Sequence, residues 1–95
     1  MRSLSEFHIT VRGKRWLLTF MPLKGDADGT CDPPMSKGKR IRVNSSLKGE
    51  RRLEVTIHEL LHAAHWDISE EAIEGAARDI ARVLWRVGYR EIESE

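Results

Sequence analysis

The sequence has one cysteine, almost no net charge and no long run of apolar residues. Because Cys31 has no second cysteine to pair with, a disulfide-stapled secreted scaffold is excluded. Sixteen Lys and Arg against 15 Asp and Glu leave a net charge of +1, which argues against a protein that binds polyanions over its whole surface. No apolar stretch is long enough for a membrane span, and none near Met1 resembles a signal peptide. We therefore expect a cytoplasmic protein without a membrane partner.

Residues 1–95 are sufficient for one domain with a small core, since 40% of them are hydrophobic. The first part of the chain favours strands, because apolar Phe7, Ile9 and Val11 alternate with polar residues. The same alternation resumes over residues 15–20 after a short break, which predicts a hairpin.

A loop rich in Gly, Pro and Asp over residues 21–38 separates this hairpin from a third predicted strand at residues 39–43. The remainder has apolar residues at helical spacing. One helix is predicted over residues 50–66, and a second begins after Ser69 as N-cap and ends near Gly88. We expect an α+β fold in which a small antiparallel sheet, made of the hairpin and the third strand, packs on a two-helix hairpin.

Residues 58–62 read His-Glu-Leu-Leu-His, the H-E-x-x-H pattern, inside the first predicted helix. Chance alone would give this pattern about 0.02 times in a chain of this composition. His58 and His62 lie one turn apart on one helix face, so both imidazoles can bind one zinc ion. Glu59 projects to the side, where it can act as general base toward a zinc-activated water. The alternative is two histidines on the polar face of an ordinary amphipathic helix.

A catalytic zinc site usually has three protein ligands, so a third must come from elsewhere. His65 lies about 10.5 Å from His58 along the helix axis, too far to share the ion. It is a candidate to face the transition state, and the alternative is an ordinary, partly exposed histidine. On the second helix, Glu74 lies level with the motif and is the predicted third ligand, with Glu70 as the second candidate. The alternative for Glu74 is a surface ion pair with Arg78.

The stretch Thr56–Ala63 resembles the active-site helix of the zincin metallopeptidases. The segment Glu74–Ala81 is similar to the glutamate-bearing second helix of gluzincin-like proteins, including the ImmA/IrrE group. The chain also looks like small, largely uncharacterised metallopeptidase-like proteins of phages and bacteria in three further segments, residues 31–34, 40–43 and 84–90.

This resemblance implies a minimal zincin-like fold, one Zn²⁺ per chain and hydrolysis of peptide bonds in a peptide or protein substrate. It implies that His58 and His62 are zinc ligands, that Glu74 is the third ligand and that Glu59 is the base. The chain is short for a peptidase, which leaves little room for a separate substrate-binding subdomain.

Three further features would complete such an enzyme. An extended peptide substrate can add to an edge strand, either in the predicted hairpin or at residues 39–43. The oxyanion needs another hydrogen-bond donor, for which His65 and Tyr89 are the candidates. Cys31 offers a different option, since a thiolate could occupy the open zinc position and keep the enzyme latent. The alternative is a small apolar residue or a free thiol in a loop.

Two alternatives to a peptidase stay open. A zinc-stabilised, non-catalytic binding module would need the histidines but not Glu59, whose presence counts against it. A nucleic-acid-binding helical hairpin would leave the histidines incidental and would use the arginines that recur every four residues on the second helix, Arg78, Arg82, Arg86 and Arg90. The interleaved acidic residues favour a solvated face instead. The oligomeric state also stays open.

Overall fold

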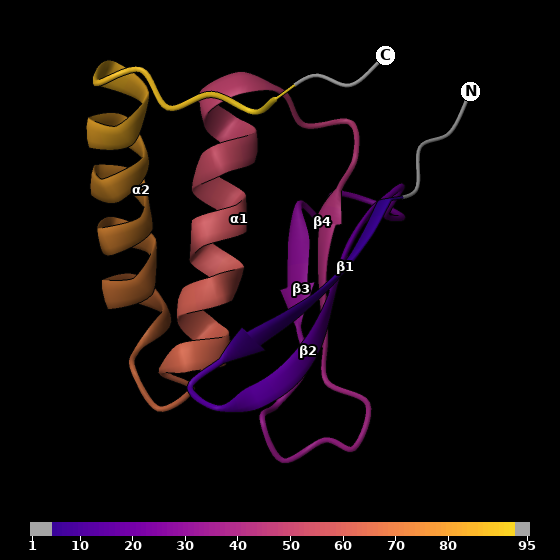
Figure 1. Ribbon diagram of the computed structural model, residues 1–95. Helices are drawn as coiled ribbons and strands as arrows, with labels where there is room; N and C mark the ends of the chain where they lie inside the picture. The colour runs from indigo at the N-terminus through magenta and orange to yellow at the C-terminus, as the bar shows by residue number, and fades with distance from the viewer. Residues whose placement is uncertain (1–4, 93–95) are drawn as a thin grey trace.

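The computed structural model describes residues 5–92 and consists of four strands followed by two helices (Figure 1). The elements are, in chain order, β1 Ser5–Val11, β2 Lys14–Met21, β3 Gly29–Cys31, β4 Arg40–Asn44, α1 Gly49–Ala64 and α2 Glu70–Arg86. The α+β class expected from the sequence is confirmed, as are the early hairpin and both helices. Neither helix in this described part of the chain is long and apolar enough to cross a membrane.

The sheet is mixed and has the strand order β1-β2-β4-β3. β1 and β2 are antiparallel and are joined by Arg12 and Gly13, which both have the positive φ that a type I′ turn requires. β2 and β4 run parallel, whereas β3 and β4 are antiparallel. The sheet therefore differs from the antiparallel, three-stranded sheet expected from the sequence.

The difference arises in the connection between β2 and β4. Residues 22–39 are long enough to return the chain to the end of the sheet where β2 begins, as a parallel neighbour requires. Part of this connection forms β3, which pairs with the far side of β4 and makes one edge of the sheet. A three-residue strand that begins with glycine has no clear alternation of apolar and polar residues, so no sequence signal marks it.

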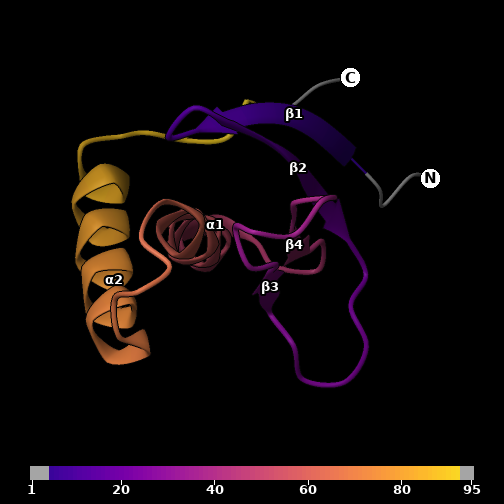
Figure 2. The same cartoon turned by 90° about the horizontal axis from the view of Figure 1, so that it is seen from below.

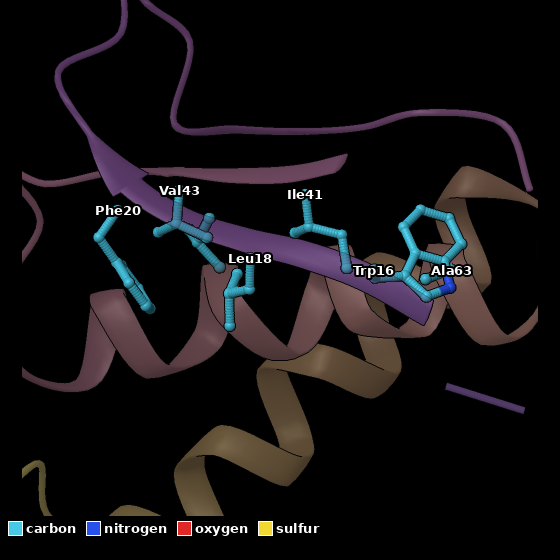
Figure 3. Packing of buried hydrophobic residues seen from close by; sticks show 7 residues of the cluster. Trp16, Leu18, Phe20, Ile41, Val43 and Ala63 are labelled. Carbon is cyan, nitrogen blue, oxygen red and sulfur yellow. The ribbon is translucent and has the colours of Figure 1, made fainter. Parts of the chain in front are cut away.

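The hydrophobic core lies between the sheet and α1 (Figure 3). The two central strands supply alternate residues and α1 supplies two more, giving the set Trp16, Leu18, Phe20, Ile41, Val43, Val55 and Ala63. In the register of β3 and β4, Cys31 is paired with Ile41 and Gly29 with Val43, so these two residues of the edge strand lie on the same face of the sheet as the core residues. The edge strand β3 thus presents Gly29 and Cys31 on the side of α1.

The second helix packs on the outside of the first. Among the described helices and strands α2 contacts α1 alone, so α1 lies between α2 and the sheet (Figure 2). The buried residues of α2 are Ile73 and two small residues, Ala77 and Ala81.

Two contacts fix the connection between the helices. The Ser69 hydroxyl accepts a hydrogen bond from the Ala72 N–H at 3.1 Å, so the predicted N-cap of α2 is confirmed. At the end of α1, the Arg12 guanidinium donates to the Ala64 carbonyl at 3.0 Å. The turn between β1 and β2 is thereby held against the last turn of α1.

Candidate metal centre

The H-E-x-x-H residues lie in the third and fourth turns of α1 and divide between two faces of the helix. Val55, Glu59 and Ala63 are spaced by four residues and form the buried face that packs on the sheet. His58 and His62 are one turn apart on the neighbouring face, with their ring centroids 4.9 Å apart. Consecutive helical residues differ by about 100° in direction, which separates Glu59 from both imidazoles.

Glu70, the first residue of α2, meets both imidazoles. Its two carboxylate oxygens lie 3.0 Å from Nε2 of His58 and 2.7 Å from Nε2 of His62. Because a carboxylate only accepts hydrogen bonds, both rings donate from Nε2 in this arrangement. One ligand atom from each of the three residues lies within 4.8 Å of the others, so the group could hold a single metal ion.

Glu74, the predicted third ligand, is exposed and is not part of this cluster. The prediction preferred Glu74 to Glu70 because a bend at Asp67 and Ile68 places Glu74 level with the motif. The buried face of α2 is centred near Ala77. At 100° per residue, Glu70 lies about 20° from this centre and Glu74 about 60° from it. The second candidate, Glu70, is therefore the residue that the packing of α2 brings to the histidines.

His65 and Tyr89, the candidates for an oxyanion donor, do not line the cleft beside the motif. His65 is the C-cap of α1, where its N–H donates to the Leu61 carbonyl at 2.8 Å, and it is exposed. Tyr89 follows α2 and is 65% exposed. The structure leaves both side chains away from the His58–Glu70 cluster.

Glu59 is the one buried carboxylate within residues 5–92, with 7% of its surface exposed. Its Oε2 lies against β3, so close that a Cβ on Gly29 would be 2.8 Å away. Burial raises the pKa of Glu59 to about 7, and repulsion by the Glu70 carboxylate contributes to the increase. The carboxylate thus sits between α1 and the edge strand.

A cleft of about 350 Å³ runs between the edge strand and the motif. It is lined by residues of β3 and α1 and by Trp66 and Glu70. Trp66 is 42% exposed and lies edge-on to the His62 ring, with centroids 6.1 Å apart. Gly29 and Trp66 could not be selected from the sequence, because neither carries a group with catalytic or ligand chemistry.

The donor set of the cluster fits zinc. Two imidazoles and one carboxylate are a set used by catalytic zinc sites, in which a fourth position stays open for water or substrate. The two imidazoles are mostly buried, with 18% and 16% of their side-chain surfaces exposed, whereas that of Glu70 is 68% exposed. The cluster therefore has fixed histidines and one side that opens to solvent and to the cleft.

Cys31 lies in the cleft but is not a member of the cluster. Burial, together with repulsion by the Glu59 and Asp32 carboxylates, raises the pKa of its thiol to about 12. The Sγ–H donates weakly to the Asp32 carbonyl at 3.4 Å. In the metal-free protein the side chain is therefore a neutral thiol.

The arginines of the second helix do not form one continuous basic face. The Arg90 guanidinium stacks over the Trp85 ring at 3.5 Å and donates to the Trp85 carbonyl at 2.7 Å. Arg82 lies 3.9 Å from Asp79 on the same helix. Of the four arginines Arg78, Arg82, Arg86 and Arg90, these contacts do not involve Arg78 and Arg86.

Comparisons with protein-family models, curated proteins and solved structures give no match. The similarity to zincins therefore rests on the motif residues. Any functional conclusion has to be drawn from the side chains of the cluster and the cleft.

Replacing Gly29 by alanine tests the contact between β3 and Glu59. The new Cβ would lie 2.8 Å from Glu59 Oε2 and 2.9 Å from Val55 Cγ1, so the strand or the side chains must shift. We expect the free energy of unfolding to fall by about 1–3 kcal/mol, measured by urea titration. Gly38→Ala is the matched control, because a Cβ there meets nothing within 4 Å. Equal stability of the two variants would contradict the contact.

The high pKa of Cys31 predicts slow alkylation in the folded, metal-free protein. Since the thiolate is the nucleophile, iodoacetamide at neutral pH should modify Cys31 much more slowly than it modifies the same residue after unfolding in urea. Mass spectrometry of the intact chain follows the reaction. A folded-state rate equal to the unfolded rate would show that the thiol is neither buried nor raised in pKa.

Proposed function

We propose that this protein is a zinc-dependent peptidase that binds one Zn²⁺ per chain through His58, His62 and Glu70. The observation that carries the proposal is the convergence of these three ligand atoms within 4.8 Å, with the buried Glu59 lining the same cleft. A metal site alone would not need the glutamate that follows the first histidine. Its position at the wall of the cleft supports a reaction rather than a purely structural ion.

In the proposed reaction the zinc ligands and Glu59 have separate roles. A zinc ion held by the cluster supplies Lewis-acid activation of a water molecule and of a carbonyl oxygen. Glu59 accepts a proton from the attacking water and transfers it to the leaving nitrogen as the C–N bond breaks. Glu70 lies at the capped start of α2 and contacts both imidazoles in the metal-free protein, so its carboxylate would be the third ligand beside them.

The edge strand β3 is the element that we propose binds the substrate. It pairs with β4 on one side only, and it forms the wall of the cleft opposite His58 and His62. An extended peptide can hydrogen-bond to such an edge and so pass in front of the cluster. The strand at residues 39–43, one of the two expected from the sequence, cannot serve because β4 is paired on both sides. The hairpin strand β1 is the opposite edge of the sheet.

Zinc titration of the metal-free protein tests the ligand set. Wild type should bind about one zinc per chain, and His58→Ala and Glu70→Ala should each weaken binding by more than about tenfold, since removing even an outer partner of a zinc ligand costs that much. Glu74→Ala is the matched control on the same helix and should bind like wild type. Failure of wild type to bind zinc would refute the site, and a loss confined to Glu74→Ala would restore the original third ligand.

Substitution of Glu59 by glutamine tests the reaction. Cleavage of a proteome-derived peptide library by the zinc-loaded protein should fall by about 10²–10⁴-fold in Glu59→Gln, because the amide cannot accept a proton, while zinc affinity is retained. Glu50→Gln, on the same helix but outside the cleft, is the control and should cleave like wild type. Wild type that binds zinc and cleaves nothing would instead identify a non-catalytic zinc module. Undiminished cleavage by Glu59→Gln would refute the mechanism.

A further inference from the structure

A second hollow, of about 230 Å³, adjoins the cleft beside the motif. The two spaces have four lining residues in common, Gly29, His58, Glu59 and Glu70. The second hollow adds five more, Asp28, Arg51, Glu54, Val55 and Glu74. Because the shared residues include two of the proposed metal ligands, the cleft and the second hollow form one groove that extends to both sides of the cluster.

The two ends of the groove follow the direction of the elements that line it. The second hollow is lined by an early part of α1, residues 51–55, whereas the cleft is lined by the later His62 and Trp66. On the side of the sheet, Asp28 belongs to the second hollow and Cys31 to the cleft. Strand residues are about 3.3 Å apart. A peptide extended along β3 would therefore pass from one end to the other within a few residues of the cluster.

The free edge of β3 has backbone groups that can hold such a peptide. The Asp28 carbonyl accepts a hydrogen bond from the Asn44 N–H of β4 at 2.8 Å. In an antiparallel pair the backbone groups of successive residues alternate in direction, so those of Gly29 and Cys31 point away from β4. These two residues are the ones that line the groove.

The second hollow is acidic. It adds three carboxylates, those of Asp28, Glu54 and Glu74, against the single guanidinium of Arg51. Arg51 lies 2.7 Å from Asp28 and 3.1 Å from Glu54, so its one charge is divided between two carboxylates. Glu74 has no ion-pair partner within residues 5–92, Arg78 included. The residues that only the cleft contributes include no Lys, Arg, Asp or Glu. The groove therefore has a negative end and an uncharged end.

The buried Glu59 side chain indicates that this groove receives a ligand. It is only 7% exposed, and burial and charge repulsion act on it without any hydrogen bond from a described residue, yet it lines both spaces. A buried acceptor without a partner costs free energy unless water or a ligand supplies the donor. The acidic end itself does not suit a metal ion, because the His58–Glu70 cluster is the one group in the described chain whose ligand atoms converge. Carboxylates spread along an open groove suit the ammonium or guanidinium of a long side chain.

We infer that the substrate is a peptide with a lysine or arginine close to the cleaved bond, held in the acidic end of the groove. This inference rests on the proposed function, because it names the substrate class of the same site. The peptide backbone pairs with β3, and the cationic side chain lies against Glu54 and Glu74. The residue on the other side of the cleaved bond lies toward Trp66. An acidic residue in place of the lysine would meet like charges.

Binding of matched peptides to the full, metal-free chain tests the inference without turnover. The probes are Ala-Ala-Lys-Ala-Ala and its norleucine counterpart, both with blocked termini, and the backbone amide shifts in NMR spectra follow binding and verify the fold. The lysine peptide should bind about threefold to thirtyfold more tightly and shift the amides of Gly29 and Glu54. The preference should disappear in the double variant Glu54→Gln/Glu74→Gln. Glu71→Gln, on the same helix as Glu74 but outside the groove, is the matched control and should keep it.

No difference between the two peptides in wild type, or a preference that survives in the double variant, would overturn the inference. Cleavage sites in a peptide library then locate the cationic residue. Zinc-loaded wild type should cleave mainly where lysine or arginine occupies one fixed position near the bond, and Glu74→Lys should reduce cleavage at these sites by about tenfold. Cleavage without any preference for charge would overturn the inference and leave the reaction intact. Lysine-selective binding without cleavage would refute the proposed reaction and retain the acidic end as a cation site.

Discussion

The packing of α1 between two layers is the constraint on which the rest of the structure depends. α1 is the only described element that contacts both α2 and the sheet, and it presents a different face to each. The sheet-facing side carries Glu59 between Val55 and Ala63, and the neighbouring side carries His58 and His62. Two adjacent residues of one motif therefore reach different surroundings. The glutamate is desolvated against β3, while the imidazoles meet a carboxylate from α2.

Much of the fold follows from local patterns in the sequence. The alternation in β1 and the helical spacing around residues 50–66 are local patterns, visible in a single strand or helix. In β1 the alternation corresponds to partial burial of Ile9 and Val11, whereas Phe7 is 50% exposed. The Ser69 cap is a local hydrogen bond and was equally predictable. The parallel pairing of β2 with β4 was not, because it depends on the path of residues 22–39 through space. No local pattern records the direction in which a long connection returns.

The candidate site could likewise be predicted only in part from the sequence. The motif on α1 could be found from spacing alone, since its two histidines share a helix face. The choice between Glu70 and Glu74 depended on where along α1 the second helix begins, because a bend assumed at Asp67 and Ile68 placed Glu74 level with the motif. In the structure Glu70, the first residue of α2, is the glutamate that contacts both imidazoles. The role of Gly29 depends on a missing side chain, which becomes informative only when Glu59 is seen beside it.

The small residues between the helices have a consequence for the proposed chemistry. Ala77 and Ala81 are completely buried where α2 meets α1. The separation of two packed helix axes depends on the size of the side chains at their contact. A larger residue at either position would move α2 outward and carry the Glu70 carboxylate away from the imidazoles. The two alanine methyl groups in the middle of the helical hairpin thus set the distance between Glu70 and the two histidines at its end. Substitutions at these apolar positions would therefore disturb the ligand cluster although neither residue contacts a ligand atom.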